Sequence, residues 1–388
     1  MYVVVGAGLA GMAAALTLQK SGAEVAVVES SDRAGGRVAS DQIDGFILDR
    51  GFQLINANYP EIKRWNLLKD IDFKTAPRTV GVSTSSGIAR LGDPRGALFS
   101  TFSKKTGSIF TKASFLRYLA GSPRFDESVE EHFLRTGVGD FYFKVLKPFL
   151  QGVFLAEPSK VSATIGREII GSFINGRSGI PSRGAGELAA QMALQVKDLR
   201  LNTQVEEIVE GGVQTSRGFI SAKKIVLATD LTTAGQLLGA DEIGALAGST
   251  TWYHAASTAP SSSAELIIDS ENRGPVINSI VISNLSREYA PTGQNLISST
   301  TIKHASESEV RRQLAQMWGS STEEWRFLAK YEINSALPLF QPGYKERTEV
   351  KIEKNTYCAG DYLQSPSQNG ALLSGRKAAE QLLIDQRS

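Results

Sequence analysis

The sequence predicts an α/β protein that opens with a Rossmann-like βαβ unit. An apolar strand at 2–5, an Ala- and Leu-rich helix that runs to Lys20 and a second apolar strand at 23–28 follow one another directly. The spacing G-x-G-x-x-G falls between the first strand and the helix, at Gly6, Gly8 and Gly11. In such a turn the first glycine permits a tight bend, the second lets the backbone approach a pyrophosphate, and the third lets the helix pack on the strand. We therefore expect a dinucleotide site at this loop, where the helix N-terminus attracts phosphate charge.

An acidic residue at the end of the second strand supports this prediction. Glu29 follows the glycines by about 20 residues, the distance at which a carboxylate accepts a hydrogen bond from the ribose of a dinucleotide. The plain alternative is a glycine-rich turn in an ordinary βαβ unit, which leaves the acid unexplained. We expect the cofactor to contact Glu29 and the whole loop, Gly6, Ala7, Gly8, Leu9, Ala10 and Gly11.

Length and composition limit the remaining classes. The chain has 388 residues, of which 41% are hydrophobic, enough for a large core and two or three domains. Its 42 basic and 40 acidic residues nearly balance, so the overall charge does not favour a nucleic-acid partner. The single cysteine, Cys358, excludes an internal disulfide and favours a reducing compartment. We expect no metal site, because the histidines are far apart in the sequence, at His132, His254 and His304.

The uncharged stretch 1–19 is not expected to be a signal peptide. It lacks a basic start, glycines interrupt it, and the strand-loop-helix pattern accounts for it. No other apolar run approaches the length of a membrane span. We expect a soluble cytoplasmic protein that is not exported.

The segment after the second strand specifies which dinucleotide binds. Residues 30–37 read SSDRAGGR and resemble the R-x-G-G-R signature of the FAD-dependent flavin amine oxidase superfamily, which includes protoporphyrinogen oxidases, phytoene desaturases and amine oxidases. The resemblance implies that FAD is the cofactor. It also implies that this segment follows the pyrophosphate and the flavin, with contacts from Ser30, Arg33, Gly35, Gly36 and Arg37.

A β-hairpin is predicted at 38–48 by the turn residues Asp44 and Gly45. The hairpin ends in 49–53 (DRGFQ), which is similar to the superfamily's D-x-G segment, where the backbone lies near the flavin ring. The resemblance implies flavin contacts from Gly51, Phe52 and Gln53. A plain hairpin explains the same residues, and both interpretations can hold.

Later segments resemble further cofactor-binding elements of the superfamily. Residues 203–208 (TQVEEI) match a T-x-V-x-x-I strand in which the backbone of the valine, here Val205, receives the adenine. Near the end, 357–361 (YCAGD) resembles the closing A-G-(D/E) motif, so Gly360 and Asp361 are expected to hold the ribityl chain or pyrophosphate. A helix N-terminus is expected to face flavin C2=O and stabilise the reduced flavin, at Gln368, Asn369, Gly370 and Ala371. Cys358 is not expected to form a covalent flavin bond.

The resemblance implies two domains. The FAD-binding domain is expected at 1–56, 176–231 and 345–388, with an α+β substrate domain inserted at 57–175 and 232–344. Within the substrate domain, 127–163 and the A-L-P passage at 336–338 resemble protoporphyrinogen oxidases and desaturases. Phe340 and Tyr344, just after this passage, either line a substrate pocket or belong to the core.

The stretch 90–124 is rich in basic residues and phenylalanine. One interpretation is a peripheral membrane contact or a patch for an anionic substrate, because basic amphipathic segments bind anionic groups. The interpretation that we favour is a solvated helix face with phenylalanines directed to the core.

The resemblance implies an FAD-dependent oxidoreductase. Such an enzyme transfers a hydride equivalent from a C–N or C–C bond of a small organic substrate, apolar or anionic, to flavin N5. The protoporphyrinogen oxidase or desaturase type is favoured, and a flavin amine oxidase is the alternative. A non-catalytic binding protein like the GDP-dissociation inhibitors shares this architecture, but the intact R-x-G-G-R and G-D segments argue against it. Positioning of the substrate carries most of the catalysis, and the sequence identifies no catalytic acid or base.

Overall fold

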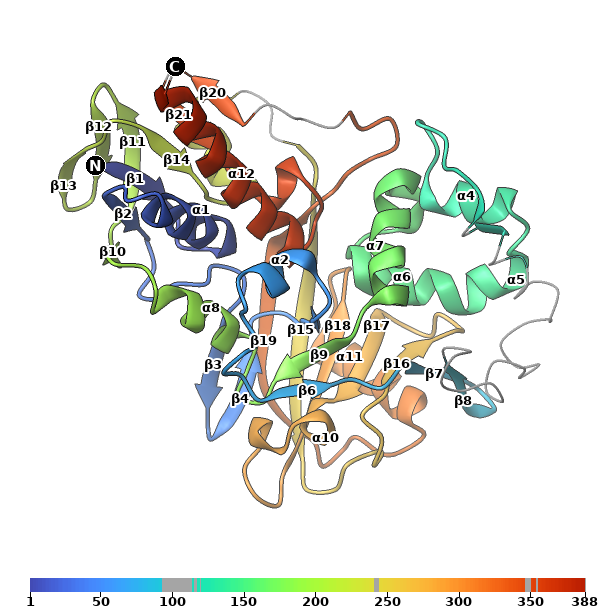
Figure 1. The fold of residues 1–388 in the computed structure, drawn as a ribbon. Coiled ribbons are helices and arrows are strands. Elements are labelled where there is room, and N and C mark those ends of the chain that lie inside the picture. Colours follow the sequence, from blue (N-terminus) through green and yellow to red (C-terminus); the bar gives the residue numbers. More distant parts are fainter. Residues whose placement is uncertain are drawn as a thin grey trace.

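The structure is a computed structural model that describes residues 1–92, 114, 117, 118, 120–240, 244–345, 350–353 and 355–387. Two large sheets and the helices that cover them make up the fold (Figure 1). This is the mixed α/β class that the sequence predicts.

The first large sheet has the strand order β10-β2-β1-β14-β21-β20. Neighbouring strands pair in parallel, except that β20 is antiparallel to β21. Its strands are β1 (Tyr2–Val5), β2 (Val25–Val28), β10 (Leu199–Arg200), β14 (Ile225–Leu227), β20 (Lys351–Glu353) and β21 (Thr356–Cys358). The central strands are buried along their whole length, as in parallel sheets covered on both faces. Three segments that are far apart in the sequence therefore build this sheet.

Helices from both ends of the chain pack on this sheet. Helix α1 (Leu9–Lys20) lies beside the C-terminal helix α12 (Gln368–Arg387), and α8 (Gly186–Ala193) adds to the same core (Figure 1). A Cβ atom at Gly375 would lie only 1.9 Å from the carbonyl oxygen of Ala10. Glycine is thus what lets α1 and α12 approach so closely.

A small antiparallel sheet follows β10. Its strands are β11 (Val205–Val209), β12 (Gly212–Thr215) and β13 (Gly218–Ser221), and helix α9 (Leu231–Leu237) comes after β14. Together with β1, β2 and β14, these elements enclose a second hydrophobic cluster on the other side of the first sheet.

The second large sheet has the order β19-β15-β18-β17-β16-β7-β8. Its strands are β7 (Thr79–Thr84), β8 (Gly87–Gly92), β15 (Leu246–Ala256), β16 (Leu266–Asp269), β17 (Val276–Val281), β18 (Asn295–Thr301) and β19 (Arg326–Pro338). Helix α11 (Glu307–Trp318) covers one face, where Val310 and Leu314 join the cluster of Trp252 and Ile267. A capping box between Ser306 and Glu309 fixes the start of this helix.

A helical region lies beside this sheet (Figure 1). It contains α4 (Val129–Arg135), α5 (Gly139–Phe141), the π-helical η3 (Tyr142–Leu146), α6 (Lys147–Phe154), η4 (Pro158–Lys160) and α7 (Ala163–Asn175). Its core packs on Val82 and Ile268 of the sheet and includes Phe340, while Tyr344 packs against it partly buried. Of the two interpretations given for Phe340 and Tyr344, these positions favour the core.

The segments that connect the two large sheets form smaller units. They are the hairpin β3 (Ser40–Ile43) and β4 (Phe46–Asp49), the sheet of β5 (Ile55–Asn56), β9 (Ser178–Pro181) and β6 (Phe73–Thr75), and the short helices α2 (Pro60–Arg64), α10 (Ile282–Leu285), η5 (Arg287–Tyr289) and η6 (Asp361–Leu363). The predicted turn of the hairpin is present, and Asp44 and Gly45 both have positive φ.

The last residue of β4, Asp49, is fully buried and ties these units together. Its Oδ1 accepts hydrogen bonds from the hydroxyl of Ser40 at 2.6 Å and from the N–H of Ala185 at 2.9 Å. Its Oδ2 accepts one from the hydroxyl of Tyr289 at 2.8 Å. Burial raises the pKa of this carboxyl, and the three hydrogen bonds act in the opposite direction.

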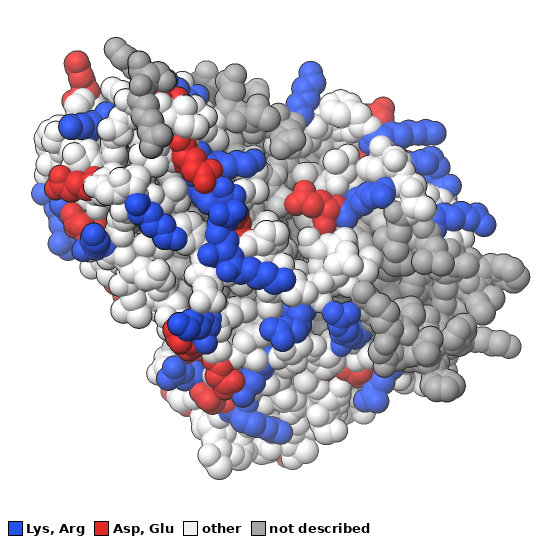
Figure 2. Space-filling model, viewed as in Figure 1, with Lys and Arg blue, Asp and Glu red and all other residues white. Residues whose placement is uncertain are grey.

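Most of the basic stretch 90–124 lies outside the described residues, including Phe99, Phe102, Phe110 and Phe115. On the face shown in Figure 2, Lys and Arg side chains gather in a band over α12 and α2, with acidic side chains beside it. No helix in the described part of the chain is both long and apolar enough to cross a membrane.

Candidate cofactor site

The predicted dinucleotide loop lies between β1 and α1. Gly6 has φ of +97°, and a Cβ there would lie 2.8 Å from the carbonyl oxygen of Ala228. A Cβ at Gly11 would lie 1.9 Å from the carbonyl oxygen of Gly6. At Gly8, in contrast, the Cβ position has no described atom within 4 Å. Packing therefore requires the first and third glycines, whereas the second leaves free space beside the backbone.

Glu29 joins this loop to the segment after β2. One carboxylate oxygen accepts a hydrogen bond from the N–H of Ala7 at 2.7 Å. The other accepts from the N–H of Ser31 at 2.9 Å and from the hydroxyl of Ser30 at 3.3 Å. This second oxygen, Oε1, also lies 2.8 Å from the hydroxyl of Ser31, so its lone pairs are already engaged. The capacity for a ligand hydroxyl therefore remains on Oε2, which accepts the one hydrogen bond from Ala7.

The paired glycines of the R-x-G-G-R segment lie against the loop. The N–H of Gly35 donates to the carbonyl oxygen of Ala7 at 2.9 Å, and Gly35 forms a bridge with Gly8. A Cβ at Gly36 would lie 3.5 Å from the Cα of Gly8. The two glycine-rich turns thus meet at the free space beside Gly8.

The two arginines of this segment point in different directions. Arg33 pairs with Asp41 on β3 (Nη1 to Oδ1, 2.7 Å), which holds it at the hairpin. Arg37 pairs with Asp361 of the closing motif (Nη2 to Oδ1, 2.7 Å) and donates to the carbonyl oxygen of Ala336 on β19 at 2.6 Å. Burial lowers the pKa of Arg37, but the carboxylate of Asp361 opposes it, and the net pKa lies above its ordinary value. Arg37 is therefore a fixed positive charge where these segments meet.

Two glutamine amides connect the hairpin exit to α12. Gln53 Nε2 donates to the carbonyl oxygen of Arg37 at 2.7 Å, and Gln368 Nε2 donates to Gln53 Oε1 at 3.3 Å. The Oε1 atom of Gln368 is buried and has no hydrogen-bond partner among the described residues. Asn369 accepts a hydrogen bond from the N–H of Glu61 on α2 at 3.1 Å.

Gly51 and Phe52 lie over the second large sheet. Gly51 has φ of +93°, and a Cβ there would lie 3.2 Å from Cδ1 of Ile333 on β19. The N–H of Phe52 donates to the hydroxyl of Thr251 on β15 at 3.2 Å. The three residues predicted to face the flavin thus stand between the closing motif and this sheet.

The N-terminus of α12 is closely packed. The hydroxyl of Ser367 accepts a hydrogen bond from the N–H of Gly370 at 3.0 Å, and the first turn contains no acidic residue. A Cβ at Gly370 would lie 2.0 Å from the carbonyl oxygen of Ser365. Ala371 is buried in the core that α1 and α12 share.

Val205 begins β11, next to the predicted ribose-binding acid. The N–H of Thr203 donates to the carbonyl oxygen of Glu29 at 2.7 Å, and the N–H of Asn202 donates to that of Ser31 at 2.8 Å. The predicted adenine contact and the predicted ribose contact are therefore neighbours in space.

Comparison with known proteins identifies the family. The family model described as flavin containing amine oxidoreductase matches residues 9–383. The chain belongs to this family. The resemblance found in the sequence is thereby confirmed.

Individual relatives of this amine oxidoreductase family match only parts of the chain. Chloroplastic protoporphyrinogen oxidase from Nicotiana tabacum is 26% identical over 179 residues, which are 41% of this chain and 30% of that protein. Putrescine oxidase from Kocuria rosea is 50% identical over 60 residues, 16% of this chain and 13% of that protein. The matches thus span a third or less of these curated relatives.

Solved structures match over nearly the whole chain. An oxidoreductase from Methanosarcina mazei has a TM-score of 0.78 at 15% identity, covering 98% of this chain and 99% of that one. Putrescine oxidase bound to putrescine has a TM-score of 0.73 at 17% identity, covering 99% and 98%. At these identities the likeness shows the fold.

Membership of the flavin-containing amine oxidoreductases also confirms the predicted cofactor, FAD, and the geometry fits it. Free space lies beside Gly8, and the first turn of α1 has neither a side-chain cap nor an acidic residue. An anion there would meet the positive end of a helix. The residues that would hold the cofactor are those of the loop, Glu29, the glycine pair and the closing motif. When bound, a flavin supplies the electron acceptor, and the chain supplies binding and orientation.

The Cys358 thiol, in the strand that leads into the closing motif, is not activated. Burial raises the pKa of the Cys358 thiol to about 12, so it stays protonated and is a poor nucleophile. In the described part of the chain, no group of three or more His, Cys, Asp or Glu side chains could hold a metal ion.

Sequence reasoning missed three contacts of this amine oxidoreductase site. They are the hydrogen bonds from Arg37 to the carbonyl oxygen of Ala336, from the N–H of Phe52 to the hydroxyl of Thr251, and from the N–H of Gly360 to the hydroxyl of Ser374. A backbone carbonyl and isolated hydroxyl residues have no signature in a sequence, so no motif would have revealed them.

Proposed function

We propose that the protein transfers a hydride equivalent from a C–N or C–C bond of a small organic substrate to N5 of bound FAD. The observation that carries the proposal is the convergence of separate chain segments at Arg37, which contacts Asp361, Ala336 and Gln53. These contacts hold the R-x-G-G-R segment, the hairpin exit, β19 and the closing motif in one arrangement. Correct placement of cofactor and substrate is most of what hydride transfer requires.

The groups at this convergence orient ligands rather than move protons. The amides of Gln53 and Gln368 do not titrate near neutral pH, and Asp361 is engaged by Arg37. Family membership also supports an enzyme over the binding-protein alternative, because the family is one of flavin-containing oxidoreductases.

For the substrate, we infer the protoporphyrinogen oxidase or desaturase type. The segment 127–163, the A-L-P passage and the matches to chloroplastic protoporphyrinogen oxidases support this choice. Amine oxidation is the second candidate, because a 60-residue segment is 50% identical to a putrescine oxidase.

The test is spectroscopic. The purified protein is expected to be yellow with flavin absorbance, and anaerobic addition of a porphyrinogen or a polyene is expected to bleach it. Bleaching by amines alone would favour the second candidate. A colourless protein that cannot be reconstituted with FAD would refute both.

A further inference from the structure

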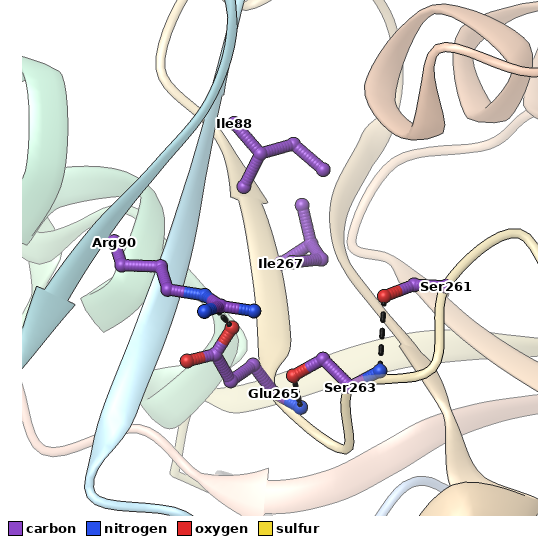
Figure 3. A pocket seen from close by; sticks show the side chains of 6 residues that line it. All are labelled: Ile88, Arg90, Ser261, Ser263, Glu265 and Ile267. Atoms are coloured by element: carbon purple, nitrogen blue, oxygen red, sulfur yellow. Dashed lines mark hydrogen bonds and ion pairs between the residues drawn. The ribbon is translucent and has the colours of Figure 1, made fainter.

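A cavity of about 480 Å³ opens on the second large sheet (Figure 3). It is lined by Ile88, Arg90, Ser261, Ser263, Glu265 and Ile267. Ile267 belongs to the cluster of Trp252 beneath α11, whereas Thr251, the preceding residue on β15, contacts Phe52. Successive strand residues point to opposite faces of a sheet. The cavity and the predicted flavin site therefore lie on opposite faces.

The guanidinium of Arg90 pairs with a buried carboxylate. Its Nε donates to Glu265 Oε2 at 2.9 Å, and Glu265 is buried and also accepts a hydrogen bond from the hydroxyl of Thr79. The Arg90 side chain is 64% exposed, and no described residue accepts a hydrogen bond from its two terminal nitrogens. Figure 3 shows the guanidinium above Glu265 on one side of the cavity, with Ile267 and Ser261 on the other side. The terminal N–H groups are thus free for a ligand.

Two serine hydroxyls add further donors. Ser261 Oγ accepts a hydrogen bond from the N–H of Ser263 at 3.0 Å, and Ser263 Oγ accepts one from the N–H of Glu265 at 3.1 Å. Neither hydroxyl donates to a described residue, so both O–H groups remain free to donate to a ligand. The amide of Asn284 donates to the carbonyl oxygens of Ser261 and Ser263 at 2.8 and 2.9 Å, which holds the loop in place.

We propose that this cavity binds a small monocarboxylate with a short branched alkyl tail. The terminal nitrogens of a guanidinium form a planar fork that matches the two oxygens of a carboxylate. The serine hydroxyls donate to the same head group, while Ile88 and Ile267 give the tail an apolar wall. Glu265 offsets the charge of Arg90, so a single negative charge is favoured over a phosphate dianion. This site is independent of the proposed redox activity.

The test is calorimetric titration of the FAD-loaded protein with 3-methylbutanoate. We expect a dissociation constant on the order of millimolar, as suits a ligand of this size. Arg90→Gln should weaken binding by about tenfold or more, because a charged hydrogen-bond donor is lost. Arg90→Lys keeps the charge next to Glu265 but lacks the fork, so it should also weaken binding. Arg217→Gln, in the exposed turn between β12 and β13, is the matched control and should bind as the parent does.

Ser261→Ala keeps the test decisive if Arg90→Gln fails to fold, because it removes one donor from the cavity and should weaken binding. Acetate should bind more weakly than 3-methylbutanoate, and the flavin absorbance should not change on saturation. The proposal is overturned by the absence of binding, by equal binding to parent and Arg90→Gln, by tighter binding of inorganic phosphate, or by a flavin spectrum that responds to the ligand.

Discussion

Glycines that look alike in the sequence have different surroundings in the structure. At Gly8 a side chain would enter free space, whereas at Gly370 it would collide with the backbone of Ser365. Substitution of Gly8 therefore tests ligand binding. Substitution of Gly370, for example by aspartate, tests packing instead and cannot isolate an electrostatic effect on the flavin.

Gln368 is the position at which to test the charge near the predicted flavin edge. Gln368→Glu keeps the shape of the side chain and adds a negative charge at the N-terminus of α12. At an effective dielectric of about 20, like charges separated by 4 Å repel by about 4 kcal/mol, and greater distance reduces this. We expect the two-electron flavin potential to fall by roughly 20 to 90 mV, which corresponds to about 1 to 4 kcal/mol. An unchanged potential, with FAD retained, would show that this helix end does not face the flavin.

Glu29 should control cofactor retention. Glu29→Ala removes the acceptor of the Ala7 and Ser31 N–H groups as well as the predicted ribose contact. Loss of a charged acceptor should weaken FAD binding by about 10 to 150-fold. Flavin content and the FAD dissociation constant report the effect, with Glu206→Ala, at an exposed position of β11, as the control. Equal FAD affinity in both variants would contradict the role given to Glu29.

At the scale of the elements, the close contact between helices α1 and α12 depends on small residues. The first 20 residues and the last 20 described residues form one core through this contact. Both helix N-termini are predicted to face the cofactor, so their relative position sets the geometry of the site.

Gly375→Ala should separate these two helices. The added methyl group would lie 1.9 Å from the carbonyl oxygen of Ala10, so one helix must shift, and overpacking of this kind costs about 1 to 3 kcal/mol. Gly171→Ala in α7 is a matched control, because its Cβ would meet nothing within 4 Å and alanine favours helix by about 0.5 to 1 kcal/mol. Urea unfolding and flavin release measure both. Equal stability of the two variants would mean that the contact is not tight.

At the scale of the whole molecule, Asp49 links parts that are distant in sequence. Its carboxyl group contacts Ser40, Ala185 and Tyr289, and the segment predicted to face the flavin begins two residues later at Gly51. Asp49 therefore fixes the hairpin against both the first core and η5.

Tyr289→Phe should weaken this link. Loss of one hydrogen-bond donor to a buried carboxylate should lower the unfolding free energy by about 1 to 3 kcal/mol. Because burial raises the pKa of Asp49, the cost should be greatest where the carboxyl is ionised and should shrink as the pH falls through its folded-state pKa. Tyr331→Phe, which removes a hydroxyl from the less buried Asp41, is the control and should cost less. A pH-independent loss in Tyr289→Phe would argue against an ionised Asp49.

The sequence by itself determined the βαβ start with its dinucleotide loop and the hairpin turn at Asp44 and Gly45. These features depend on residues that are close together in the chain, where spacing and turn chemistry act directly. The family and the cofactor followed from the resemblance of short motifs to a known superfamily. The resemblance to the family also placed a helix N-terminus at 368–371, where α12 begins. Local spacing was thus sufficient to predict those features that are determined by residues close together in the chain.

Only the tertiary structure decided how these segments meet. It directed Arg33 to Asp41 and Arg37 to Asp361 and Ala336, although both arginines belong to one motif. Arg37 and Ala336 are 299 residues apart, and a contact between a side chain and a distant backbone carbonyl leaves no pattern in the sequence. Long-range packing likewise determines the close contacts at Gly370 and Gly375 and the assignment of sites to the two faces of the second large sheet. Such packing sets what surrounds a residue once its local conformation is fixed.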